Sequence, residues 1–327
     1  MAPPGCESVK GQAYLFWALA SGDDRSDARP ARAEDAAWDN ASVAQLKITE
    51  FTDPGCPFAW SAEPARRRLD WLYGEQLDWE LRMVGLAETA DQYERHGFTP
   101  ERQSASFWRL AREHHMPIDT SLRPRMSATV PACRAVVAVR RHQPERERAI
   151  LRGLRVLHFS GSLLDEPDTI TAAAHRAGVD SEALVRWLGE SETEASLRED
   201  LELARRPTPG ALALSHKLAQ NGNGHRYTCP SYELARVGDE VALSAPGFQP
   251  VAAYEVAVAN LCPEADRRVD PQAVGEVLAW ADEPLATAEV AAVCEIGLDE
   301  ARERLGQVAD EEHVGFDGLW HLNAVAA

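Results

Sequence analysis

The residues with the clearest chemical potential lie in the segment FTDPGCPFAW, residues 51–60. Cys56 follows the strand-like run LKITEF (residues 46–51) and precedes Pro57, a residue type favoured in the first turn of a helix. A cysteine at a helix start faces unpaired backbone N–H groups, which lower a thiol pKa from about 8.5 into a range of roughly 3.5–7.5. The sequence therefore predicts a nucleophilic thiolate at Cys56, and the alternative is a small apolar side chain used for packing.

The position three residues after Cys56 carries no reactive side chain. A redox dithiol would place its second cysteine there, but the residue is Ala59. Because alanine cannot resolve a mixed disulfide, an adduct on Cys56 would need a second thiol from elsewhere. Phe58 is expected to shape the rim of the thiol site, with packing as the alternative, and Trp60 is expected in the core.

An α/β pattern positions this segment. After the strand LKITEF the sequence predicts a helix, a second strand, a mostly helical stretch and a return to extended structure that ends in a helix. The corresponding ranges are 57–74, 77–86, 100–204, 225–234 with 240–245, and 249–261.

A plausible linker begins at Cys262, and a smaller unit is expected after it. Three helices and a two-strand wing around Asp317-Gly318 are predicted there, and Thr287 is expected to be an N-cap. The helices cover residues 271–281, 287–297 and 298–311, and the wing covers residues 313–322. This unit, residues 270–327, resembles a winged helix-turn-helix.

Three separated segments resemble the DsbA family of thioredoxin-fold proteins, which includes FrnE-like oxidoreductases. They are ITEFTDPGCPFAW (residues 48–60), HFSGSLLDEPDTITAAAHRAGVD (residues 158–180) and TCPSYEL (residues 228–234). The resemblance implies a mixed α/β thioredoxin fold over residues 45–262, with an all-helical insertion at about 100–204. The sequence departs from the family pattern at Ala59 and at its cysteine before the second proline.

That second proline is Pro230, which the resemblance implies to be cis and to lie in a loop folded against the start of the Cys56 helix. Thr228 and Cys229 precede it, and Cys229 would then face the reactive sulfur. Three interpretations stay open for Cys229: a disulfide partner of Cys56, a soft metal ligand, or a filler of serine size. No further ligand is evident at this mouth, so a metal is not expected.

Other reactive side chains receive more ordinary interpretations. Arg66, Arg67 and Arg68 are expected to form a solvated basic face, with binding of an acidic small thiol as the alternative. His114 and His115 are expected at the surface, with shaping of the pocket as the alternative. The remaining cysteines beyond the N-terminal tail are expected to be inert, namely Cys133, Cys262 and Cys294.

Composition limits the partners. The chain of 327 residues has a formal net charge of −18, which disfavours nucleic acid and anionic membranes as general partners. Between Thr287 and Leu322 nine acidic residues face two arginines, so DNA binding by the winged unit is not expected. The unit is instead expected to have a docking or structural role.

The six cysteines are scattered, without CxxC spacing, which indicates a reducing, cytoplasmic location. The apolar run AYLFWALA (residues 13–20) points to the alternative of secretion, because it has the features of a weak secretory signal. Residues 1–44 are expected to be a disordered or variable tail. No run is long enough to predict a membrane span, and no oligomeric state is predicted.

These observations predict a thiol–disulfide oxidoreductase, or a thiol-dependent reductase or transferase, acting through Cys56 on a small-molecule or protein substrate. Cys229 or a low-molecular-weight thiol would resolve the intermediate, and no tightly bound cofactor is expected. Two alternatives remain: a non-catalytic thioredoxin-fold binding module, and a glutathione-type isomerase. The isomerase is the weaker one, because relatives of that kind are expected to carry serine at the position of Cys56.

Overall fold

The computed structural model describes residues 44–239 and 242–323. The apolar run at residues 13–20 and nearly all of the predicted N-terminal tail lie outside the described residues. Two residues of the predicted strand 240–245 also lie outside them. By their contacts, residues 1–41 and 42–327 form two units, and the description below concerns the second.

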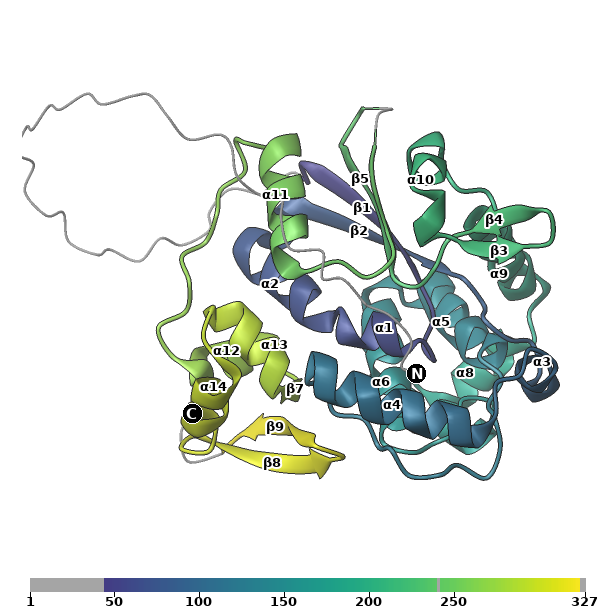
Figure 1. Ribbon diagram of the computed structural model, residues 1–327, viewed down its shortest axis with the longest axis horizontal. Helices are drawn as coiled ribbons and strands as arrows, with labels where there is room; N and C mark the ends of the chain where they lie inside the picture. The colour runs from purple at the N-terminus through teal and green to yellow at the C-terminus, as the bar shows by residue number, and fades with distance from the viewer. Residues whose placement is uncertain (1–43, 240–241, 324–327) are drawn as a thin grey trace, which may run out of the picture. The chain divides into compact units, whose positions relative to one another are not determined.

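A four-stranded mixed sheet forms the centre of the fold (Figure 1). The strands are β1 (Leu46–Thr52), β2 (Leu77–Met83), β5 (Ser231–Arg236) and β6 (Leu243–Pro246), in the order β2-β1-β5-β6. β1 runs parallel to β2, while β5 is antiparallel to both β1 and β6. The central strand β1 is buried because its neighbours cover both of its edges, and its side chains Leu46 and Ile48 enter the core.

Two helices follow the first strand where the sequence predicts one. α1 (Pro57–Ser61) and α2 (Glu63–Tyr73) meet at Ala62. Pro64, in the first turn of α2, has no backbone N–H to donate, so a helix boundary just before it removes no hydrogen bond. α2 packs against α11 (Val251–Leu261), and both contribute to the same hydrophobic cluster as β1.

The predicted helical stretch is present as a series of helices after the short helix α3 (Ala90–Arg95). They are α4 (Pro100–His114), α5 (Val130–His142), α6 (Glu147–Phe159), α7 (Pro167–Arg176), α8 (Ser181–Leu188) and α9 (Ser191–Ala204). α5 is buried along most of its length and packs against α6, α8 and α9. α9 in turn packs against β2, which attaches the insertion to the sheet.

A small connecting segment leads back to the sheet. It contains α10 (Pro209–Ala213) and the hairpin of β3 (Ala219–Asn221) and β4 (Gly224–Arg226). α10 packs against β6. The Cys229–Pro230 peptide bond that follows is cis, and β5 begins directly after it.

The final helix of this part differs from the sequence prediction in its buried face. The predicted face contained Ala253, Val256, Ala257 and Asn260, but α11 buries Tyr254, Ala257 and Val258. Val256 is exposed. Alanine and valine occur on every side of this helix, so its apolar periodicity is weak and tertiary contacts decide which face is covered.

The C-terminal region begins near residue 274 and contains three helices and a small sheet. The elements in order are α12 (Val274–Ala281), β7 (Leu285–Ala286), α13 (Thr287–Cys294), α14 (Leu298–Leu305), β8 (Ala309–Val314) and β9 (Asp317–Leu322). The sheet order is β7-β9-β8. Three helices and a two-strand wing are therefore present, but the third helix is shorter than the predicted range 298–311. α14 ends at Leu305 before Gly306, and residues 309–311 belong to β8. The name winged helix stays a prediction.

Two details of this region correct the sequence analysis. The turn between β8 and β9 lies at Gly315 and Phe316, not at Asp317-Gly318, which begin β9. Thr287 is the first residue of α13 rather than its N-cap. Its hydroxyl donates to Asp317 at 2.7 Å, and Glu289 accepts the backbone N–H of Ala286 at 2.8 Å. The Glu289 carboxylate thus supplies the reciprocal half of a capping box, while the threonine hydroxyl bonds to Asp317 and does not cap the helix.

The basic run on α2 is not a solvated face, which corrects another prediction. Arg68 is only 1% exposed and donates to the Val293 carbonyl at 2.7 Å. Arg67 is also buried and pairs with Glu283 and Glu289 of the C-terminal region. Consecutive helix residues point about 100° apart. The side chains of Arg67 and Arg68 therefore reach acidic residues from a later part of the chain, and the local sequence does not reveal these partners.

α13 packs against α2, so the C-terminal region is attached to the thioredoxin unit through this helix (Figure 1). The attachment also has an apolar component, because Val290 and Val293 belong to the same hydrophobic cluster as Leu69 and Leu72. No helix in residues 44–239 or 242–323 has the length and apolar character needed to cross a membrane.

Candidate active site

Cys56 lies in a tight turn directly after the central strand. The Cys56 N–H donates to the Asp53 carbonyl at 3.2 Å, and the next residues form α1. Gly55 is required at its position, because a Cβ atom there would lie 2.7 Å from Cγ2 of Thr129. The turn therefore places the thiol at the start of α1, as the sequence predicts. Cys56 is 6% exposed.

Asp53 anchors this turn, and the sequence analysis did not single it out. Its carboxylate accepts the Gly55 N–H at 2.8 Å, the Leu86 N–H at 2.9 Å and the Thr129 hydroxyl at 2.9 Å. The Cys133 thiol lies 3.5 Å away as a fourth donor. Burial raises the pKa of Asp53 in spite of these donors. An aspartate just before a Pro-Gly turn was the available signal, since such side chains often bond to nearby backbone N–H groups.

The structure brings Cys56 and Cys229 together across 173 positions of sequence. The Cys56 Sγ donates to the Cys229 carbonyl oxygen at 3.2 Å. Both residues are buried, and both are free thiols. They share one apolar cluster with Phe51 and Ala59. The loop before Pro230 therefore closes over the start of α1, as the resemblance implies.

The surroundings shift the pKa values of the two thiols in opposite directions. A hydrogen bond with the Cys229 side chain lowers the pKa of Cys56, and this effect outweighs burial. The backbone N–H groups of Ala59 and Phe58 lower that pKa further, while the charge of Asp53 raises it. Burial and the nearby Cys56 raise the pKa of Cys229. One sulfur is therefore set to carry negative charge and the other to keep its proton.

The residues after Cys56 divide between the surface and the core. Pro57 occupies the first position of α1. Ala59 is buried beside Cys56, so the position of a usual second cysteine is filled by a methyl group. Trp60 is 1% exposed, as expected for a core residue, and donates from Nε1 to the Pro117 carbonyl at 2.9 Å.

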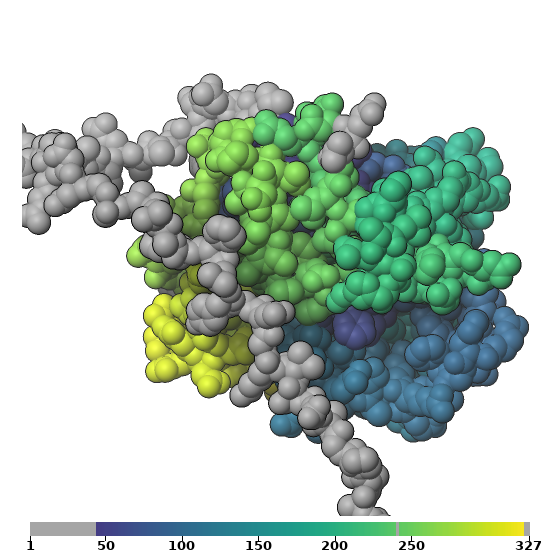
Figure 2. All heavy atoms as spheres, turned by 45° about the horizontal axis from the view of Figure 1, so that its top comes forward, coloured from purple at the N-terminus to yellow at the C-terminus, as the bar shows by residue number. Residues whose placement is uncertain are grey.

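Phe58 is 38% exposed and lies at the rim of the thiol site. Its ring is 6.1 Å from that of His114 and 6.4 Å from that of Phe248, centre to centre. His114, expected mainly at the surface, is half-buried in this aromatic rim, whereas His115 is exposed. Figure 2 shows the purple atoms of the early chain emerging between the blue and green segments.

Thr228 holds the loop that carries Cys229. Its hydroxyl donates to the Lys217 carbonyl at 2.8 Å, and its own carbonyl accepts from the Ser231 hydroxyl at 2.6 Å. Ser231 also accepts the Gly247 N–H at 3.1 Å. These bonds tie the loop to the turn at Lys217 and, through Ser231 of β5, to the residue after β6, which fixes Cys229 relative to the sheet.

Tyr93 of α3 is a further residue near the site that sequence reasoning missed. Burial raises its pKa well above the ordinary range, and the charges of Asp53, Cys56 and Cys229 raise it further. No local sequence signal marks it, because α3 reaches the site only through the fold.

The arrangement suits thiol chemistry. It combines a thiol of lowered pKa, the backbone carbonyl of a second cysteine 3.2 Å from its sulfur, and an aromatic rim. Within residues 44–239 and 242–323, no group of three or more histidine, cysteine or carboxylate side chains is arranged to hold a metal ion. Burial raises the pKa values of the other described cysteines, Cys133, Cys262 and Cys294.

Comparison with known proteins gives one curated relative and several similar structures. The ClpXP adapter protein SpxH of Halalkalibacterium halodurans is 24% identical over 270 residues, covering 80% of this chain and 81% of the relative. A structure described as a putative protein disulfide isomerase from Nitrosomonas europaea has a TM-score of 0.50 at 15% identity, covering 67% of this chain and 98% of that chain. No protein-family model matches the chain.

A probable DsbA oxidoreductase from Streptomyces coelicolor is also similar, with a TM-score of 0.48 at 15% identity, and covers 69% of this chain and 93% of that chain. The likeness to the Nitrosomonas europaea structure and the strand order of the sheet show a mixed α/β, DsbA-like thioredoxin fold with a helical insertion, as predicted from the sequence. A small, separate sheet follows in the C-terminal region.

Proposed function

We propose that the protein is a thiol–disulfide oxidoreductase in which Cys56 is the nucleophile and Cys229 resolves the intermediate. The observation that carries this proposal is the position of the Cys56 Sγ, 3.2 Å from the carbonyl oxygen of Cys229, together with the opposite shifts of the two thiol pKa values. The missing half of a CxxC pair would thus be supplied from the loop before Pro230.

The chemistry balances with two thiols. The Cys56 thiolate attacks one sulfur of a substrate disulfide, forms a mixed disulfide and expels the other sulfur as a thiolate. Cys229 then loses its proton to solvent and attacks the Cys56 sulfur, which releases the second substrate thiolate. The substrate gains two electrons, and the protein is left with a Cys56–Cys229 disulfide. A low-molecular-weight thiol would restore the dithiol by thiol–disulfide exchange. The protein would then reduce its substrate, which is the direction suited to a cytoplasmic location.

The substrate class follows from the surface around Cys56. The thiol is nearly buried, and the exposed neighbour is the Phe58 ring with His114 and Phe248 beside it. Such a rim favours a small disulfide, or an extended peptide disulfide with an apolar neighbour, over a bulky folded surface.

The test uses reduced protein, a small peptide disulfide and oxidised glutathione, with thiol release followed over time. Cys56→Ser should bring both reactions to the uncatalysed rate. Cys229→Ser should still undergo the first attack and accumulate the mixed disulfide, which mass spectrometry detects as an adduct on Cys56. Cys294→Ser, in the C-terminal region, is the matched control and should behave like the wild type.

Non-reducing peptide mapping of the oxidised protein gives the second readout. A Cys56–Cys229 peptide pair is expected after one turnover. A fully active Cys56→Ser variant would end the proposal. An active Cys229→Ser variant that releases its adduct as fast as the wild type would remove Cys229 from the mechanism and leave a monothiol enzyme resolved by an external thiol.

A second candidate is a binding module without turnover, such as an adapter. The curated relative is described as a ClpXP adapter protein, and the exposed Phe58 rim offers an apolar contact surface. In that case the pH dependence of iodoacetamide alkylation should give Cys56 an ordinary thiol pKa of about 8.5. Fluorescent cysteine-free peptides with an aromatic residue should then bind wild type and Cys56→Ser equally.

A further inference from the structure

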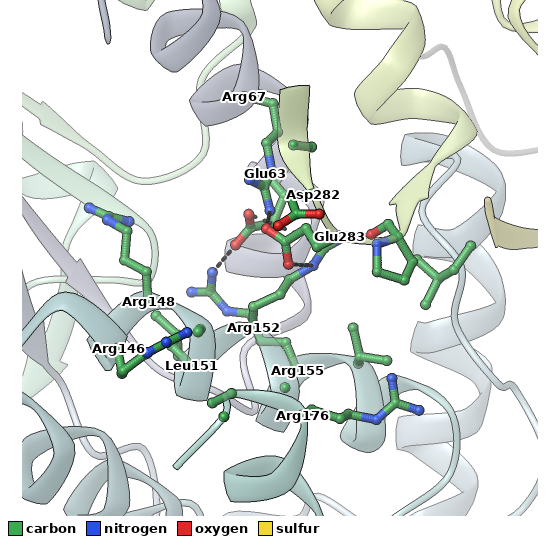
Figure 3. Close-up of a pocket in the computed structure, with 18 of the residues that line it drawn as sticks. Glu63, Arg67, Arg146, Arg148, Leu151, Arg152, Arg155, Arg176, Asp282 and Glu283 are labelled. Carbon is green, nitrogen blue, oxygen red and sulfur yellow. Dashed lines mark hydrogen bonds and ion pairs between the residues drawn. The ribbon is translucent and has the colours of Figure 1, made fainter. Parts of the chain in front are cut away.

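A second hollow in the molecule lies away from the thiol pair. It has a volume of about 750 Å³ and is bounded by α2, α6, the end of α7 and the segment from Ala281 to Pro284 (Figure 3). Its lining contains neither Cys56 nor Cys229. The volume falls within the range of roughly 300–1,000 Å³ that is usual for small-molecule pockets.

The lining is rich in arginine, although the protein as a whole is strongly acidic. Seven arginines and four carboxylates face this hollow. The arginines are Arg66, Arg67, Arg146, Arg148, Arg152, Arg155 and Arg176, and the carboxylates are Glu63, Glu145, Asp282 and Glu283.

The deepest arginines have structural partners. Arg152 donates to Glu289 at 2.9 and 2.7 Å, and Arg155 pairs with Glu63. These pairs explain why the buried charges are tolerated. They also account for the attachment of the C-terminal region, because Glu289 and Glu283 belong to it.

The ion pairs that attach the C-terminal region do not occupy every guanidinium donor of these arginines. The Nε atoms of Arg66, Arg152 and Arg155 and the Nη2 atom of Arg148 are buried and lack a hydrogen-bond acceptor among the described residues. Arg152 and Arg155 are themselves almost wholly buried. A buried donor without an acceptor costs free energy, so the internal pairs of this cluster leave part of its guanidinium charge without a hydrogen-bond partner in the part of the chain that the structure describes.

The rim carries cations that the attachment does not use. Within the described part of the chain, Arg146 and Arg176 form no ion pair with a carboxylate, and both are exposed at the mouth. Arg148 has one carboxylate partner, Glu50, at 3.5 Å. Figure 3 shows Arg146, Arg148 and Arg176 without a contact to the other residues drawn. Docking of the C-terminal region therefore does not explain these three side chains.

We propose that this arginine-lined hollow binds a small polyanion that carries several phosphate groups. Phosphate oxygens match the planar fork of guanidinium donors, and several linked phosphates can contact the rim and the deeper donors together. Glu145 and Asp282 at the edge of the hollow would repel a flat, extended polyanion. The hollow therefore favours a compact ligand. The ligand would touch α2, the insertion and the C-terminal region at once, and would stabilise their association.

The test measures binding to the full chain by isothermal titration calorimetry at constant ionic strength, since salt screens exposed charges. The probes are tripolyphosphate, ATP, inorganic phosphate and acetate. One saturable site for tripolyphosphate or ATP is expected, with weaker phosphate binding and none for acetate. Tighter binding of ATP than of tripolyphosphate would assign a nucleotide, and the reverse order would assign a free polyphosphate.

Variants of the rim provide the decisive comparison. Arg146→Gln/Arg176→Gln removes two cations without breaking an ion pair, and should weaken binding by about tenfold or more. Arg109→Gln/Arg186→Gln removes two exposed arginines that do not line the hollow, and should bind as the wild type does. Failure of the wild type to bind either polyphosphate probe would overturn the proposal. Equal binding by the rim variant would overturn it as well.

Discussion

The Cys56 site and the junction between α2 and the C-terminal region both bury ionisable groups, but they stabilise charge in different ways. At the junction, arginines are paired with Glu63, Glu283 and Glu289. At the thiol site no cation is paired with Cys56, and its pKa is lowered by the Cys229 side chain and by backbone N–H groups. The junction therefore keeps its charges at neutral pH, while the thiol site can gain and lose one.

This difference separates anchoring from chemistry. A buried ion pair fixes two parts of a chain, because removing either partner leaves an uncompensated charge. A thiolate stabilised by neutral donors can instead form and break a covalent bond without leaving such a charge behind. Perturbing each region should therefore give a different readout: stability for the junction and reactivity for the thiol site.

The largest effect on stability is expected for Glu289→Gln. Glu289 is fully buried, pairs with Arg152 and Arg67, and accepts the Ala286 N–H. Loss of its charge should lower the free energy of unfolding by about 3–5 kcal/mol, measured by urea denaturation. Glu300→Gln, an exposed partner of Arg304 on α14, is the control and should cost less than about 1 kcal/mol. Equal effects would mean that the junction is not held by its buried charges.

Acid should weaken the junction before it affects the thiol pair. Burial would raise the pKa of Glu63, but the charges of Arg155 and Arg152 outweigh it and hold that pKa well below the ordinary value. A lowered carboxyl pKa contributes stability above the unfolded pKa of about 4.3, and this stability is lost as pH falls further. The same direction holds for Glu283, which lies near Arg67.

The measurement is the urea midpoint of the wild type and of Glu63→Gln between pH 7 and pH 3. The wild type should lose stability below about pH 4.3, and the variant should show a smaller loss over that range. A variant with an unchanged slope would exclude Glu63 as the titrating group.

The reactivity of Cys56 should depend on Cys229. Because the Cys229 side chain is the largest cause of the lowered pKa of Cys56, Cys229→Ala should move the midpoint of iodoacetamide alkylation to higher pH. Thr228→Ala changes the adjacent residue, which bonds to Lys217 rather than to Cys56, and should leave the midpoint nearly unchanged. An unmoved midpoint in Cys229→Ala would show that the backbone N–H groups alone set the acidity.

The smallest effect is expected at the rim. Phe58→Ala removes an exposed ring that touches neither thiol charge, so the alkylation midpoint of Cys56 should not move. Loss of part of its apolar contact with substrate should lower kcat/KM for a peptide disulfide by about fivefold, corresponding to about 1 kcal/mol. Phe98→Ala, another exposed phenylalanine, is the control. A similar loss in both variants would argue against a rim specific to the site.

Local sequence patterns predicted much of the fold and the position of Cys56 at a helix start. The run LKITEF, the Pro-Gly turn and Pro57 determine a strand, a turn and a helix start within a few residues, so the local sequence places Cys56 at that helix start. The same reasoning found most helices of the insertion, because their apolar residues recur at helical spacing.

The tertiary structure decided the features that depend on distant segments. It brought Cys229 to Cys56, placed Asp53 under the turn, and converted the arginines of α2 from an expected solvated face into a buried junction. A sequence specifies its own turns and faces through short-range sterics and periodicity. It does not show locally which acidic residue, more than 200 positions later, will neutralise Arg67, because that pairing exists only when both segments are packed together.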